Sequence, residues 1–153
     1  MKKNIYYDIK YIKLAYDYAN KHSKCLRRKV GAVLVPHNNK NIILSTNIPV
    51  PDSLQCIKEG CIRDHSHILS GQHTNICRCV HAEVDLILQC ALHNISPINS
   101  TVYCTLSPCA SCARILSKAQ IRRLVFCEDY PDSEFISIFQ SSNIEFEKID
   151  YKS

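Results

Sequence analysis

Two short segments carry the residue types that bind a metal ion and move protons. They are His81–Glu83, which reads HAE, and Pro108–Cys112, which reads PCASC. Cys109 and Cys112 are three residues apart, so on a helical turn they would lie on one face and could bind one metal ion together. His81 could supply a third ligand. Three protein ligands leave a fourth position open for water, which is typical of a catalytic zinc site.

Glu83 follows His81 by two residues, so on a helix it would point about 200° away and would not share the metal. From a first turn it could still reach a metal-bound water, whose pKa zinc lowers to around 7. A carboxylate that takes this proton and passes it to a leaving amine serves as general base and general acid. The alternative is a redox pair in the Cys-x-x-Cys, with His81 and Glu83 as surface groups.

The rest of the chain predicts the elements that position these segments. Helical spacing covers 8–22, with Asp8 as N-cap, and also 80–92 and 132–140. Ser107 followed by Pro108 predicts a further helix start, with Ser107 as N-cap. Strand patterns cover 29–35, 41–46, 101–106, 122–127 and 144–149. This order predicts one α/β domain over 1–153, a three-layer α/β/α fold around a mixed five-stranded sheet.

Composition bounds the class of protein. The chain has 153 residues, of which 46% are hydrophobic and 22% charged, as in a folded domain. A net charge of +5 suits a small anionic substrate but is too weak to indicate duplex nucleic acid. No apolar run approaches the ~20 residues of a membrane span, and the first ten residues lack the apolar stretch of a secretory signal. We therefore expect a cytoplasmic protein, whose ten cysteines are metal ligands or catalytic thiols.

The sequence resembles the deoxycytidylate deaminase family, in the bacterial and archaeal branch that includes the late-competence-operon deaminases. H-x-E with P-C-x-x-C is a known signature of zinc nucleobase deaminases. The other matching segments lie between about residues 10 and 135: 25–33 (CLRRKVGAV), 56–63 (CIKEGCIR), 70–72 (SGQ), 76–78 (ICR) and 130–132 (YPD). The resemblance implies a cytidine-deaminase-like fold and zinc-dependent hydrolysis of deoxycytidylate to deoxyuridylate and ammonia. It assigns the zinc to His81, Cys109 and Cys112, and the proton transfer to Glu83.

The segment 47–79 is rich in cysteine and has no periodicity, and a loop of that length usually needs something to hold it. Relatives in the family carry a second zinc in these regions. Four thiolates would make a closed, structural zinc site here, namely Cys25, Cys56, Cys61 and Cys77. Other possible ligands compete with them: His65, His67, His73 and Cys79. Reduced thiols that pack as small apolar groups are the alternative.

The resemblance also implies substrate contacts at Asn47 and, for a 5′-phosphate, at Arg28. A turn asparagine and a solvated basic face are the alternatives. The chain departs from the family at two places. Val84–Leu86 replaces the x-Asn-Ala that usually follows HAE, and Thr46–Pro49 lacks the usual glycine. The metal chemistry is therefore retained, whereas the pocket is altered.

Because the pocket segments depart from the family pattern, other functions stay open. One is a deaminase of another cytosine or purine nucleoside or base, or of tRNA adenosine, although the tRNA enzymes lack the cysteine-rich loop. Another is a catalytically silent, zinc-binding nucleotide sensor, against which Glu83 argues. A homo-oligomer is also expected, because family members commonly assemble and the predicted apolar face of the 80–92 helix needs cover. That face comprises Val80, Val84, Ile87, Leu88 and Ala91.

Overall fold

The computed structural model describes residues 4–38, 40–50 and 55–151. Its centre is a five-stranded sheet, whose strands run in the order β2 (Ile43–Thr46), β1 (Gly31–Val35), β5 (Thr101–Leu106), β6 (Arg123–Glu128) and β7 (Glu145–Lys148). β1 pairs antiparallel with both β2 and β5, whereas β5–β6 and β6–β7 are parallel. The predicted mixed sheet is confirmed.

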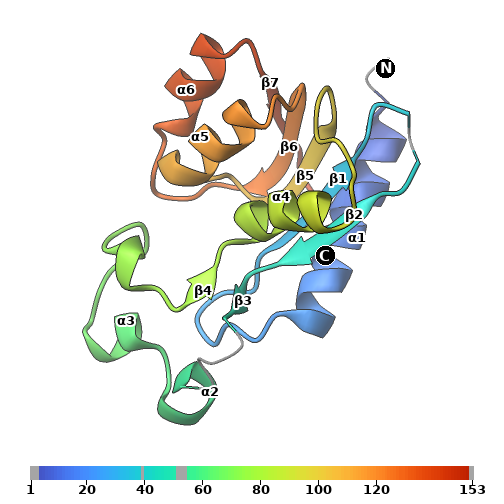
Figure 1. The fold of residues 1–153 in the computed structure, drawn as a ribbon. Helices are drawn as coiled ribbons and strands as arrows, with labels where there is room; N and C mark the ends of the chain where they lie inside the picture. Colours follow the sequence, from blue (N-terminus) through green and yellow to red (C-terminus); the bar gives the residue numbers. More distant parts are fainter. Residues whose placement is uncertain (1–3, 39, 51–54, 152–153) are drawn as a thin grey trace.

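Helices cover both faces of this sheet (Figure 1). They are α1 (Ile5–His22) on one face, and α4 (Ala82–Leu92), α5 (Ala110–Lys118) and α6 (Phe135–Ser141) on the other. Neighbouring strand residues point to opposite layers, so Val33 packs with Ile12 of α1, whereas Leu34 packs with Leu86 of α4. The three-layer α/β/α architecture is therefore confirmed. Within the described residues, no helix combines the length and apolarity that a membrane crossing needs.

The cysteine-rich segment 47–79 contains more regular structure than its lack of periodicity predicts. Its elements are β3 (Ile48–Pro49), α2 (Gln55–Glu59), α3 (Ile62–His65), the 3₁₀ turn η1 (Thr74–Ile76) and the start of β4 (Cys79–Val80). β3 and β4 pair antiparallel, and Figure 1 shows this pair with α2 and α3 beyond one end of the main sheet. Elements of two to five residues are too short to produce a period. Residues 51–54 of the segment lie outside the described residues.

Two predicted helix starts were wrong. α1 begins at Ile5, and the side chain of Asn4 caps it by accepting a hydrogen bond from the Tyr6 amide at 3.0 Å. Asp8 is instead buried in the first turn. At α5 the N-cap is Cys109, so Ser107 and Pro108 precede the helix. Asp8 and Ser107 are both plausible N-cap residues in their local sequences. In the structure their side chains bind distant residues instead, Arg123 and Tyr130 respectively.

The apolar face predicted for the 80–92 helix was also wrong. Val80 lies in β4, and α4 buries Ala82, Leu86 and Cys90. Leu88 is 50% exposed. β2 is an edge strand next to α4, so this side of the chain presents both an open strand edge and apolar side chains. Self-association stays a prediction.

A buried ion pair attaches α1 to the sheet. Arg123 of β6 donates to both carboxylate oxygens of Asp8, at 2.8 and 2.9 Å, and to Glu147 of β7 at 2.8 Å. The side chains of Asp8 and Arg123 are only 4% and 9% exposed. A buried charge that loses its partner is strongly destabilising, so this pair holds the first helix in place.

Replacing Asp8 should therefore destabilise the fold far more than replacing an exposed partner on the same helix. We expect Asp8→Ala to lower the free energy of unfolding by about 3 kcal/mol, because Arg123 stays buried with Glu147 as its remaining partner. The control is Asp17→Ala, which breaks the exposed ion pair with Lys13 and should leave stability unchanged. Urea unfolding followed by circular dichroism measures both. Equal effects of the two variants would contradict this role.

Candidate active site

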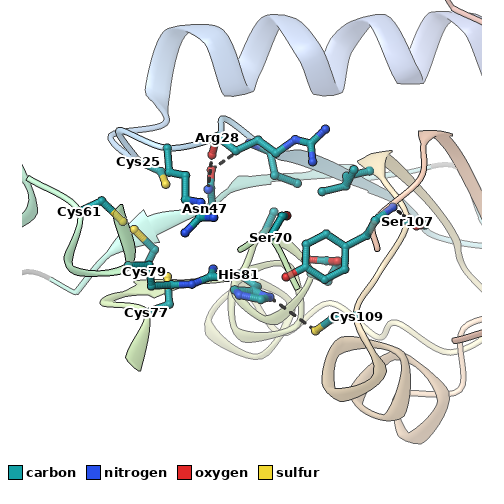
Figure 2. Close-up of a pocket in the computed structure, with 17 residues that line it drawn as sticks. Cys25, Arg28, Asn47, Cys61, Ser70, Cys77, Cys79, His81, Ser107 and Cys109 are labelled. Carbon is teal, nitrogen blue, oxygen red and sulfur yellow. Dashed lines mark hydrogen bonds between the residues drawn. The ribbon is translucent and has the colours of Figure 1, made fainter. Parts of the chain in front are cut away.

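A cavity of about 320 Å³ brings the HAE and PCASC segments together. His81 and Glu83 reach it from the start of α4, and Cys109 reaches it from the start of α5. Figure 2 shows its other walls, which come from the segment before β1, from Asn47 and from the cysteine-rich segment. The site is thus assembled from parts of the chain that lie far apart in sequence.

Three potential metal ligands converge at this cavity: His81 and Cys109 line it, and Cys112 lies next to them. His81 and Cys109 are the N-cap residues of α4 and α5, and both have extended backbones. Nδ1 of His81 lies 3.4 Å from Sγ of Cys112 and 3.7 Å from Sγ of Cys109. Tetrahedral zinc with ordinary Zn–N and Zn–S bonds requires an N–S separation of about 3.6 Å. The three residues therefore fit a zinc ion with one open position.

The electrostatics of these three residues also suit a cation. Hydrogen bonds from Cys112 and His81 lower the pKa of Cys109 to about 4. The hydrogen bond between Cys109 and Cys112 raises the pKa of Cys112. Hydrogen bonds to Cys109 and Cys77 raise the pKa of His81 to about 10. The lowered pKa of Cys109 favours its thiolate form, which is the form that binds a metal ion.

Glu83 is buried beside the metal ligands, with 5% of its surface exposed. Burial raises the pKa of its carboxyl group, and the nearby His81 partly opposes this effect. The structure explains how both residues reach one cavity although they lie two positions apart. His81 precedes the helix with an extended backbone, so the helical angle between the two side chains does not apply. A buried carboxyl that lines the cavity is suited to holding and releasing a proton.

Asn47 and Arg28 line the same cavity, but both have protein partners. Oδ1 of Asn47 accepts from Ser23 Oγ at 2.7 Å and from the Val30 amide at 2.9 Å. Its Nδ2 donates to the Arg28 carbonyl at 2.7 Å, which leaves one amide hydrogen free of these bonds. The Arg28 guanidinium donates to Glu128 at 2.7 Å and is 43% exposed. Asn47 therefore joins the segment before β1 to the end of β2, and Arg28 lies at the rim.

The two segments that depart from the family pattern have structural roles. Ile48 and Pro49 form β3, which pairs with Val80 and Cys79 of β4. Leu86 is fully buried in the core under α4. Neither departure removes a residue from the metal-ligand group. Both departures lie in elements next to that group.

Arg27 and Arg63 also line the cavity. Nη2 of Arg63 donates to the carbonyls of Leu69 and Gln72, and Nη2 of Arg27 donates to the Ile68 carbonyl. Among the described residues, Nε of Arg63 and Nη1 of Arg27 are buried with no hydrogen-bond partner, as is Nε of Arg123 away from the cavity. Arg63 belongs to the CIKEGCIR segment, but it is buried because the loop at 69–72 folds over it. No local sequence pattern predicts this burial.

Thiols form the wall of the cavity opposite the α5 start. Cys25, Cys61, Cys77 and Cys79 line it, and Figure 2 shows Cys61 and Cys79 pointing towards each other. Hydrogen bonds from Cys79 lower the pKa of Cys25 to about 6 and that of Cys77 to about 3. Cys56 is buried in α2 and is not among the cavity-lining residues.

The histidines of the cysteine-rich segment do not share this wall. His65, His67 and His73 are exposed and lie outside the cavity lining. Among the described residues, His81, Cys109 and Cys112 are the only group of three or more metal-binding side chains whose ligand atoms all lie within 4.8 Å of one another.

Comparison with known proteins adds independent evidence. Residues 6–128 match the family model described as the cytidine and deoxycytidylate deaminase zinc-binding region. The chain is 30% identical to a deoxycytidylate deaminase of Schizosaccharomyces pombe over 83% of this chain and 39% of that protein. It is 26% identical to ComE operon protein 2 of Bacillus subtilis, over 84% and 64% respectively. The chain thus spans less than two thirds of these two relatives.

A solved structure matches over almost its whole length. It is the dCMP deaminase of cyanophage S-TIM5 in complex with dCMP and dUMP. The TM-score is 0.73 and the identity 25%, and the match covers 97% of this chain and 99% of that one. The predicted cytidine-deaminase-like fold is therefore confirmed.

Proposed function

The chain belongs to the cytidine and deoxycytidylate deaminase family, and on that premise we propose that it hydrolyses deoxycytidylate to deoxyuridylate and ammonia with a zinc ion. The observation that carries this proposal is the convergence of His81, Cys109 and Cys112 beside a cavity that a buried Glu83 lines. The relatives named deoxycytidylate deaminase support the substrate, as does the cyanophage enzyme with bound dCMP and dUMP. The ten unpaired cysteines suit a reducing compartment such as the cytoplasm.

His81, Cys109 and Cys112 would hold the zinc. When bound, zinc supplies a Lewis acid that makes a coordinated water acidic near neutral pH. Glu83 then accepts a proton from the attacking water and delivers it to the amine nitrogen that leaves from the cytosine ring. Because burial raises the pKa of Glu83, its carboxyl group can retain the proton between these two steps.

Arg27 and Arg63 support a nucleotide rather than a nucleoside as substrate. Each has a buried nitrogen without a protein partner, and an unsatisfied buried donor is costly. A 5′-phosphate would supply the missing acceptors, and hydrogen bonds between charged groups are the stronger kind. In this proposal Arg28 approaches the phosphate from the rim, and the remaining amide hydrogen of Asn47 contacts the sugar.

We also propose a second, structural zinc held by the thiols of the opposite wall. Cys25, Cys61 and Cys77 belong to the set predicted from sequence and line the cavity together. The contacts of Cys79 with Cys25 and Cys77 favour it over Cys56 as the fourth ligand. Four thiolates make a closed shell, which is typical of a structural site. Such an ion would attach the cysteine-rich segment to the segment before β1.

Zinc content distinguishes the two candidates for that fourth ligand. We expect about two zinc ions per chain in protein purified without chelator, because we propose two ligand sets. Cys79→Ser should reduce this to about one, whereas Cys56→Ser, at a buried thiol outside the cavity wall, should retain both. Elemental analysis with protein quantification measures the ratio. A loss in Cys56→Ser with retention in Cys79→Ser would favour the set predicted from sequence. A parent protein with a single zinc would exclude the second site.

Glu83→Gln separates an enzyme from a zinc-binding sensor. Glutamine keeps the shape of the side chain but cannot accept a proton, so the rate of deoxycytidylate deamination should fall by about 10⁴-fold or more. The catalytic zinc should stay, because its three ligands are intact. Cys112→Ser should lose both the metal and the activity. Ammonia release and zinc content are measured on the same preparations.

More than a tenth of the parent rate in Glu83→Gln would contradict the proton transfer. Loss of zinc in that variant would instead make Glu83 a ligand.

Substrate selectivity tests the proposed function and the role of the buried arginines together. The assay is ammonia release from a panel of cytosine nucleotides, nucleosides and bases, with adenine and guanine compounds included. We expect deoxycytidylate to be the best substrate. Arg63→Gln should lower kcat/KM for deoxycytidylate by about 10- to 100-fold, because a charge-assisted hydrogen bond is lost. The value for deoxycytidine, which has no phosphate, should stay near that of the parent.

Arg114→Gln is the control, because that arginine is exposed and pairs with Glu134 away from the cavity. An equal loss with both substrates in Arg63→Gln would assign Arg63 to holding the loop rather than the phosphate. No turnover of any compound by zinc-loaded protein would overturn the proposed function and favour the sensor.

A further inference from the structure

Three hydrogen bonds join the segment that carries Cys109 to the last residue of β6 and the loop after it. The Ser107 amide donates to the Glu128 carbonyl at 2.8 Å, and the Tyr130 amide donates to Ser107 Oγ at 2.8 Å. The Ala110 amide donates to Oδ2 of Asp132 at 2.8 Å. The two segments are therefore joined on both sides of Cys109, by contacts that cross about twenty positions of the sequence.

The third of these bonds replaces a missing helix cap. The first four amides of a helix have no partner within the helix, and the N-cap side chain usually accepts from one of them. At α5 the N-cap is Cys109, whose side chain makes no capping hydrogen bond, and its sulfur faces His81. Asp132 supplies an acceptor from outside the helix. Its other oxygen accepts from the Glu134 amide at 2.9 Å, which fixes the orientation of the carboxylate.

We propose that Asp132 is a positioning residue of the metal centre. The amide that it binds belongs to the peptide unit directly after Cys109, so the bond restrains the backbone on which that sulfur is carried. Metal–ligand distances tolerate deviations of only about 0.2 Å, so small shifts of this turn weaken metal binding. The inference rests on the proposed function only in that His81, Cys109 and Cys112 bind zinc.

The oxygen acceptor of Asp132 positions the turn, whereas its negative charge has two opposing effects on the metal centre. A carboxylate near a helix N-terminus stabilises the helix, yet the same charge opposes the formation of thiolates nearby. An asparagine would keep one oxygen acceptor, which can serve the Ala110 amide, but would remove the charge and the acceptor for the Glu134 amide. An alanine would remove both. The two substitutions therefore distinguish a positional role from an electrostatic one.

The experiment measures the zinc affinity of the full-length, zinc-loaded protein by competition with a chromogenic chelator. Cys112→Ser identifies the catalytic binding class as the one that this variant lacks. We expect Asp132→Ala to weaken that class by about 10- to 100-fold, as is typical for residues that orient metal ligands. Asp132→Asn should recover most of the loss. Asp129→Ala is the control, since that carboxylate is exposed in the same loop and pairs with Lys148.

Cobalt substitution gives a second readout that a general loss of stability would not change. The thiolate-to-cobalt absorption bands should shift in Asp132→Ala and match the parent in Asp132→Asn. If Asp132→Ala does not fold, Asp132→Glu replaces it, because it keeps the charge but displaces the carboxylate by one methylene. The Asp132→Glu protein should bind zinc more weakly than the Asp132→Asn protein.

Parent-like zinc affinity in Asp132→Ala, or in Asp132→Glu where that variant replaces it, would overturn the inference and leave the metal centre intact. If Cys112→Ser binds as much zinc as the parent, His81, Cys109 and Cys112 do not form a zinc site. The proposed metal centre and the inference about Asp132 would then both be wrong.

Discussion

The metal-ligand group depends on how closely the first turns of α4 and α5 approach each other. Its ligands come from both turns, and their reactive atoms lie within 4.8 Å. The approach is set by the core beneath, where Ala82 of α4 and Ala113 of α5 are both fully buried in one cluster. Small side chains at these positions let the helix starts converge. The ligand spacing is therefore a consequence of packing against the sheet as much as of the motifs themselves.

Placing ligands at helix N-caps has a structural consequence. His81 and Cys109 hold the positions where a capping side chain would normally satisfy the first backbone amides, and neither makes such a bond. At α5 the loop after β6 provides an acceptor instead, through Asp132. The same loop carries Tyr130, which lines the cavity. One loop therefore contacts both the metal turn and the wall of the substrate cavity.

The cavity concentrates polar groups that are incompletely satisfied by the protein alone. Glu83 is buried, and Arg27 and Arg63 each have a buried nitrogen without a partner among the described residues. The two terminal nitrogens of the buried Arg123 pair with Asp8 and Glu147, although its Nε, like the nitrogens of Arg27 and Arg63, has no partner among the described residues. Unsatisfied buried groups are costly in a folded protein, and the two arginines of this cavity stand where a bound ligand could supply their missing acceptors.

Local sequence alone was enough to predict the fold class and the convergence of His81, Cys109 and Cys112. The Cys-x-x-Cys spacing fits one helical turn. The central strands β1, β5 and β6 are buried along nearly their whole length because helices cover both faces of the sheet, so they can be recognised as apolar runs without knowledge of distant contacts. The tertiary structure decided what depends on distant partners. Asp8 could not be recognised as a partner of Arg123 rather than a cap, because the two lie 115 positions apart. The buried face of α4 and the hydrogen bond from Ala110 to Asp132 were decided in the same way. In each case the local sequence predicts one role for a residue, and a contact with a residue distant in sequence gives it a different one.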